Sequence, residues 1–127
     1  MDRLGDQMLS GMDINIPVAA ESIINEATIV AINKDGYAVP ASKTTGQIVA
    51  GCAIKYTDNA LGGNGDIEVP VRRGTFVWNN DGSIKKTDIL KDAYVSDSQT
   101  VTITATGSSK VGKILAVDDD GITVEML

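Results

Sequence analysis

The stretch KILAVDDDGITVEM, from Lys113 to Met126, carries the clearest signal for the fold. Apolar and polar residues alternate from Ile122 to Met126, which is typical of an antiparallel strand with one buried face. The pair Asp120-Gly121 precedes this run, and Asp-Gly favours the tight turn of a β-hairpin. The stretch therefore predicts a hairpin that joins Lys113 to Val117 with Ile122 to Met126.

The Asp-Gly signal occurs twice more, each time between short runs that are rich in β-branched residues. Such runs on both sides of a turn pair are typical of hairpins. The two further predicted hairpins join Thr28 to Ile32 with Tyr37 to Val39, and Thr75 to Trp78 with Ser83-Ile84. Another alternating run, from Thr100 to Ala105, predicts a half-buried strand.

Two features in the middle of the chain indicate how the strands are arranged. The run from Ile48 to Ile54 is continuously apolar, as expected of a central strand that is buried on both faces. Between Ile67 and Trp78 the large apolar residues move from odd to even positions. This change of face predicts a β-bulge at Arg73-Gly74.

Little of the chain has a helical pattern. The two candidate helices, Ala19 to Glu26 and Lys86 to Asp92, are each too short to persist alone. The sequence therefore predicts an all-β fold, a small antiparallel β-barrel or β-sandwich with an extended N-terminal arm. The length of 127 residues fits one domain. We expect residues 1–26 to form the arm and a lead-in segment, and residues 27–127 to form a single β-domain.

The beginning of the chain is apolar, but Gly5 and Gly11 weaken any helix there. Two interpretations remain open, a frayed terminus and a segment that docks on a partner protein. The second makes the apolar side chains candidate interface residues. They are Leu4, Met8, Leu9, Met12 and Ile14.

The adjacent pair Arg72-Arg73 is a second candidate for the interface. Arginine is favoured at interfaces because its guanidinium can donate two hydrogen bonds to one carboxylate. A solvent-facing pair beside a bulge is an equally good interpretation. Cys52 and Trp78 are both expected in or near the core, because one lies in the most apolar run and the other is an isolated aromatic residue.

Composition argues against several classes of function. The net charge of −6 disfavours binding to nucleic acid. The chain has no histidine and a single cysteine, so it lacks the usual general base and the ligands of a thiolate zinc site. No stretch approaches the roughly 20 apolar residues of a membrane span, and the N-terminus lacks the features of a signal peptide. We expect no membrane partner, no cofactor, no metal, no catalytic residue and synthesis in a cytoplasm.

The order of these signals resembles the phage and prophage capsid decoration proteins, also called cement or head-stabilising proteins. The similar segments are QIVAGCA (Gln47 to Ala53), DIEVPVRRGTF (Asp66 to Phe76), DAYV (Asp92 to Val95), VGKI (Val111 to Ile114) and ITVEML (Ile122 to Leu127). The resemblance implies a compact β-domain on the exterior of the assembled capsid in the virion. It also implies no catalysis, the major capsid protein as partner, and self-association, often as a homotrimer.

Three alternatives remain. The first is another β-rich virion subunit, such as a tail-tube or head-completion protein, which a ring-shaped assembly would favour. The second is a non-catalytic module that binds carbohydrate or protein, although the few aromatic residues argue against a sugar-binding surface. The third is a hydrolase with a carboxylate pair drawn from Asp66, Glu68, Asp81 and Asp88, whose spacing gives no support.

Overall fold

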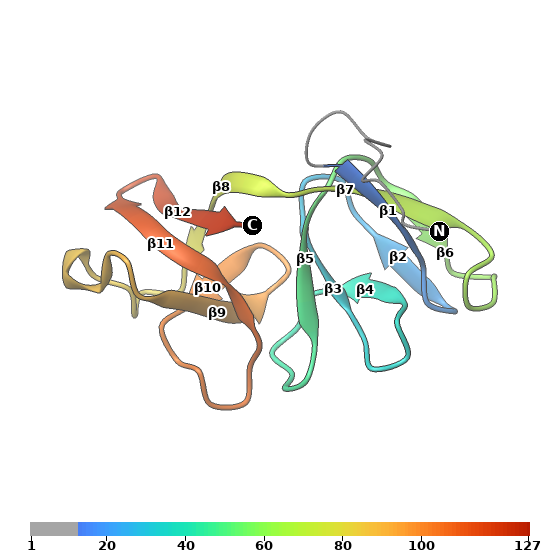
Figure 1. Ribbon diagram of the computed structural model, residues 1–127, viewed down its shortest axis with the longest axis horizontal. Coiled ribbons are helices and arrows are strands. Elements are labelled where there is room, and N and C mark those ends of the chain that lie inside the picture. Colours follow the sequence, from blue (N-terminus) through green and yellow to red (C-terminus); the bar gives the residue numbers. More distant parts are fainter. Residues whose placement is uncertain (1–12) are drawn as a thin grey trace, which may run out of the picture.

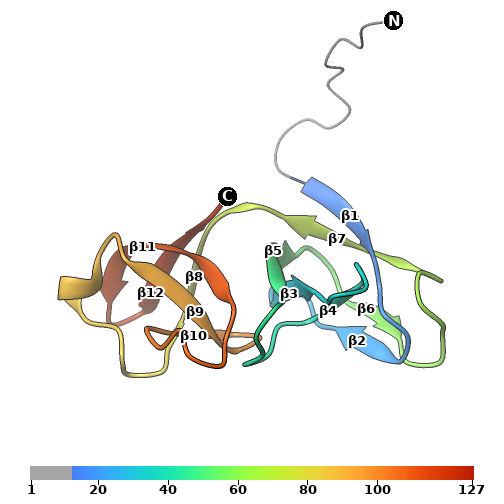
Figure 2. The same cartoon turned by 60° about the horizontal axis from the view of Figure 1, so that its bottom comes forward.

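The computed structural model describes residues 13–127 and is all-β, as the sequence predicts. Figures 1 and 2 show two packed parts, a curled sheet and a small barrel, joined where β7 runs into β8. The strands are β1 (Asp13–Pro17), β2 (Ser22–Ile24), β3 (Ile29–Ile32), β4 (Ala38–Pro40), β5 (Ile48–Ala53), β6 (Thr57–Asn59), β7 (Glu68–Arg72), β8 (Gly74–Asn80), β9 (Asp92–Asp97), β10 (Thr100–Thr102), β11 (Lys110–Asp118) and β12 (Gly121–Met126).

The first part is a five-stranded antiparallel sheet in the order β1-β7-β5-β3-β4. The predicted central strand, β5, is the middle one of the five. The sheet curls so far that its two edges meet, because Val18, just after β1, bridges to Ala38 in β4. The curled face encloses a core that contains Ile16, Val30 and Val71, all buried. A short β2-β6 ribbon completes this part.

The second part is a closed barrel of five strands in the order β10-β8-β12-β11-β9. Four of its pairings are antiparallel, and β10 runs parallel to β8. The barrel contains the predicted hairpin of β11 and β12, and the alternating residues Ile122, Val124 and Met126 are all buried in it. The predicted hairpin around Asp35-Gly36 is also present, as β3 and β4 in the curled sheet.

A shared core joins the two parts. The hydrophobic cluster inside the barrel includes Trp78, Ile114 and Val124, and it continues into Ile29 and Ala31 of β3. Along β3, Ile29 and Ala31 therefore face the barrel while Val30 faces the interior of the curled sheet. Because β3 belongs to both cores, the sheet and the barrel are expected to fold as one unit.

The predicted hairpin of residues 75–78 with Ser83-Ile84 is wrong. Strand β8 pairs with β12 and β10 instead. The Asp81-Gly82 turn is closed by side chains, since Asn80 Oδ1 accepts hydrogen bonds from the N–H groups of Gly82 (2.9 Å) and Ile84 (3.2 Å). The residues after the turn therefore do not pair with β8, and the side chain of Ile84 packs in the barrel core.

The predicted bulge at Arg73-Gly74 is also replaced by another feature. Arg73 lies between β7 and β8, where the chain leaves the curled sheet and enters the barrel. The apolar residues change position because they face two different cores on the two sides of this residue. The strand predicted from Thr100 to Ala105 is shorter than expected, since β10 ends at Thr102.

The two helical candidates have different outcomes. The first region contains β2, and the second contains a single 3-10 turn, Lys86–Asp88. Residues 13–24, assigned from the sequence to the arm and lead-in, supply β1 and β2, so that part of the expected arm belongs to the folded sheets. Across residues 13–127 no helix is long and apolar enough to cross a membrane.

Candidate protein-interaction surface

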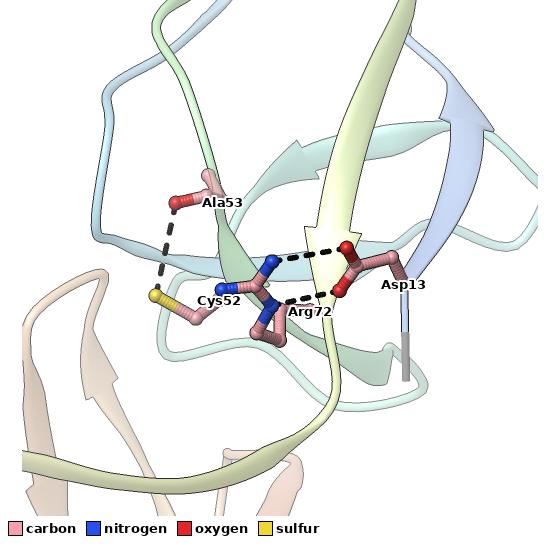
Figure 3. A network of polar contacts seen from close by, with 4 residues as sticks. All are labelled: Asp13, Cys52, Ala53 and Arg72. Atoms are coloured by element: carbon pink, nitrogen blue, oxygen red, sulfur yellow. Dashed lines mark hydrogen bonds and ion pairs between the residues drawn. The ribbon is translucent and has the colours of Figure 1, made fainter. Parts of the chain in front are cut away.

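Arg72 connects the beginning of β1 to the end of β7. In the β1-β7 ladder Asp13 is opposite Arg72. The guanidinium donates two hydrogen bonds to the carboxylate, from Nε to Oδ1 at 2.8 Å and from Nη2 to Oδ2 at 3.0 Å (Figure 3). This two-point geometry holds the first described residue of β1 in register.

The ion pair changes the acidity of both partners. The hydrogen bonds from Arg72 are the main cause of a lowered pKa at Asp13, and the positive charge of Arg72 acts in the same direction. The carboxylate of Asp13 in turn raises the pKa of Arg72. Both side chains are about half exposed, 55% for Arg72 and 43% for Asp13, so solvent and salt weaken the pair.

Cys52 lies beside this pair on β5, opposite Arg72 in the β5-β7 ladder. Its thiol is half-buried and packs against the shared core, which agrees with the expected core role. Burial raises the pKa of the thiol, and the nearby charge of Arg72 opposes that shift only in part. At neutral pH the group is therefore a thiol rather than a nucleophilic thiolate.

Arg73 has different surroundings from Arg72. It lines a surface groove of about 360 Å³ between the curled sheet and the barrel. We call this feature the Arg73 groove. It is lined by residues 47–49, Arg73, residues 110–112 and Leu127.

The Arg73 groove combines apolar contact area with positive charge. Ile48 and Leu127 are 69% and 62% exposed, so both offer apolar area to a partner. Lys110 adds a second cation, whose Nζ lies 3.4 Å from Asp92 Oδ1. Gln47 contributes a buried Oε1 for which residues 13–127 provide no hydrogen-bond donor. An extended apolar segment with a carboxylate would match the apolar side chains and the cations.

The structure separates the residues that the sequence grouped as an interface. Ile14 is half-buried and packs against the core of the curled sheet, so it serves mainly the fold. Arg72 is occupied by Asp13, and Arg73 alone faces the groove. The other candidates, Leu4, Met8, Leu9 and Met12, lie outside the described residues.

The sequence reasoning missed Gln47, Ile48 and Leu127 as surface residues. Ile48 was assigned to a strand buried on both faces, but β5 begins exposed and its first buried residue is Ala50. A signal was available, because Gln47 and the preceding Gly46 mark the end of a polar turn where burial is incomplete. Leu127 had no comparable signal.

Within the described range, no three histidine, cysteine, aspartate or glutamate side chains come together as a metal site. Comparison with known proteins gives no relative: no family model, no curated protein and no solved structure matches this chain.

Proposed function

We propose that this chain is a structural protein of a phage particle that binds the outer surface of the assembled capsid and reinforces the contacts between major capsid subunits. The proposal includes no catalytic activity and no cofactor. It rests on the sequence resemblance together with the character of the folded surface, and it identifies the Arg73 groove as the main contact with the capsid.

The observation that carries the proposal is the position of the resembling segments. They correspond to β5, the crossing from β7 to β8, and parts of β9, β11 and β12. Four of the five segments, far apart in sequence, contribute residues to the lining of the Arg73 groove, and the segment in β9 does not. Most of the residues that line the Arg73 groove, including Ile48, Arg73 and Leu127, therefore belong to segments that resemble decoration proteins.

The physical character of the groove fits binding to protein rather than to a small molecule. It is open to solvent, with apolar side chains beside two cations. A capsid subunit that presents an acidic, partly apolar segment would bury Ile48 and Leu127 and neutralise Arg73. Burial of apolar area supplies affinity, and the cations select the partner and its orientation.

Co-sedimentation with assembled shells tests the proposal. The intact protein is mixed with expanded phage shells at physiological salt, and bound copies per shell are counted after pelleting. Arg73→Glu is expected to reduce shell occupancy strongly. Lys34→Glu is the matched control, because it makes the same charge change on an exposed turn of the β3-β4 hairpin and is expected to leave occupancy unchanged.

The outcomes separate the alternatives. Failure of the intact protein to bind any shell, together with assembly into rings, would support a tail-tube or head-completion role instead. Equal occupancy for the two charge variants would remove the groove from the capsid contact. Sedimentation of the free protein measures the expected homotrimer directly.

A further inference from the structure

The loop between β6 and β7 presents an apolar side chain between two carboxylates. Leu61 is 103% exposed, more than any other large apolar side chain of residues 13–127. Asp58 and Asp66, at the two ends of the loop, are exposed as well. We call residues 58–66 the Leu61 loop. Its chemistry matches a partner that offers an apolar hollow beside positive charge.

Hydrogen bonds hold the Leu61 loop in one conformation. The buried amide of Asn59 donates to three carbonyl oxygens, one of which is that of Gly63 at 3.0 Å. The carboxylate of Asp66 closes the loop by accepting from the N–H of Gly63 at 2.8 Å. Because the loop is already ordered, a partner can bury Leu61 at little further cost in backbone entropy.

The barrel carries a surface groove of about 400 Å³ beside β9 and β11. Its apolar lining includes Leu90, Tyr94 and Ile103. We call this feature the Leu90 groove. It shares no lining residue with the Arg73 groove.

The charge of the Leu90 groove is mainly positive. Lys91 and Lys113 line it together with one carboxylate, that of Asp92. Asp92 Oδ1 lies 3.4 Å from Lys110 Nζ, and Lys91 Nζ lies 3.2 Å from Asp88 Oδ1, so these charges are paired. Lys113 Nζ donates at 3.4 Å to a main-chain carbonyl oxygen, which carries no net charge. The groove therefore offers a cation beside its apolar lining.

The backbone at Leu90 is strained, although its side chain stays largely in water. Its φ of +74° lies in the left-handed region that favours glycine, and its side chain is 62% exposed. The N–H of Leu90 donates to Ile114 O at 2.7 Å, which holds this conformation. A leucine here gains little from burial within the chain, whereas contact with a partner would bury it.

The loop and the groove lie far apart on one molecule. Figures 1 and 2 both show β6 and β9 at opposite sides, in the curled sheet part and in the barrel. One copy therefore cannot place its own loop in its own groove. Two different surfaces that fit each other form a head-to-tail contact, which repeats from copy to copy and closes into a ring or continues as a filament.

We propose that the Leu61 loop of one copy inserts into the Leu90 groove of a second copy, with the loop carboxylates toward the lysines of the groove. Charge complementarity identifies the occupant. The chain has a net charge of −6, so copies repel each other over most of their surface, but an acidic loop and a basic groove attract. The proposal does not rest on the capsid contact, which uses the Arg73 groove.

Sedimentation velocity of the purified chain at several concentrations measures this contact. We expect the intact protein to form oligomers, and Leu61→Ser and Leu90→Gly each to weaken association at least about tenfold, the ratio that about 1.4 kcal/mol of lost apolar burial gives. Val77→Ser is the matched control, because Val77 is exposed but lies outside both surfaces, and it should associate like the intact chain. Leu90→Gly should not lower the melting midpoint, since glycine adopts this φ without strain.

A mixture of the two variants tests whether the two surfaces meet. The Leu61→Ser chain keeps an intact groove, and the Leu90→Gly chain keeps an intact loop. An equal mixture should therefore form mainly dimers, through one intact contact, and few larger oligomers. A mixture that stays monomeric would overturn the pairing of these surfaces. An intact protein that is monomeric at every concentration, or unchanged association in either variant, would do the same.

Salt and phage shells separate this contact from other occupants of the two surfaces. Raising the salt concentration from about 0.1 M to about 1 M shortens the Debye length from about 10 Å to about 3 Å, so a charge-matched contact should weaken. Association that strengthens with salt would overturn the charge match. If Leu61→Ser lowered shell occupancy but left self-association unchanged, the second copy would be excluded and the loop would be assigned to the capsid.

Discussion

Replacing Ile29 with alanine should destabilise the barrel as well as the curled sheet in which Ile29 lies. Ile29 is fully buried, and it belongs to the same cluster as Trp78 and Ile114 of the barrel. The substitution removes three carbon groups at about 0.8 kcal/mol each and leaves a cavity, so the free energy of unfolding should fall by about 2–5 kcal/mol. For a chain of this length the melting midpoint should fall by roughly 3–5 °C per kcal/mol.

Two probes separate a shared core from two independent ones. Fluorescence of Trp78, the only tryptophan, reports on the barrel, and far-ultraviolet circular dichroism reports on both parts. We expect the two transitions to coincide in the intact protein and to move together in Ile29→Ala. Ile48→Ala is the matched control, because Ile48 is 69% exposed and its truncation should change stability by no more than about 0.5 kcal/mol. An unchanged fluorescence transition in Ile29→Ala would refute the shared core.

Other substitutions test local features. Gly112→Ala should destabilise the barrel severely, since its new Cβ would overlap a main-chain carbonyl of β12, and thermal melting measures this loss. Asn59→Ala should cost about 1–3 kcal/mol in chemical unfolding, because its buried amide donates to three carbonyl oxygens, whereas exposed Asn79→Ala should change little. Arg72→Met should lower the unfolding midpoint slightly at neutral pH. The pKa of Asp13 is lowered in the folded state, so this difference should be full above the ordinary carboxyl value of 3.8 and disappear as the pH falls below it. A difference that grew in acid would contradict the assigned pair.

The sequence predicted the class of fold because its strongest signals are local. The Asp35-Gly36 turn is held by Asn33 Oδ1, which accepts from the N–H groups of Asp35 and Tyr37 at 3.0 Å each, and apolar strands of similar length flank it. A turn of this kind returns the chain directly along the preceding strand. Both the reversal and the partner strand could therefore be predicted from about a dozen adjacent residues.

The turn at Asp81-Gly82 shows where such reasoning fails. It reverses the chain, but the strand partner of β8 is decided by the burial of Trp78. The residues after the turn offer one large apolar side chain, Ile84, whereas β12 offers Ile122 and Val124 directly opposite Trp78 and Phe76. Strand β8 pairs with β12, about forty residues away, because that pairing buries more apolar surface than pairing with the residues after the turn would. A local sequence pattern does not show which of the two pairings buries more.

The candidate surface was predictable only in part. The sequence identified Arg72-Arg73 as unusual but gave both arginines the same two interpretations. The two arginines have different roles for two reasons. The β1-β7 register places Asp13 opposite Arg72, and the packing of the sheet against the barrel creates the groove that Arg73 lines. Both are long-range properties of the fold.

The crossing from β7 to β8 places the ion pair and the groove on adjacent residues. The two features use different chemical groups, the side chain of Arg72 and the side chain of Arg73. A substitution at Arg73 should therefore alter binding in the groove while leaving unchanged the stability that the pair of Arg72 with Asp13 contributes. The proposed capsid contact and the ion pair can thus be tested separately, although their residues are neighbours in the chain.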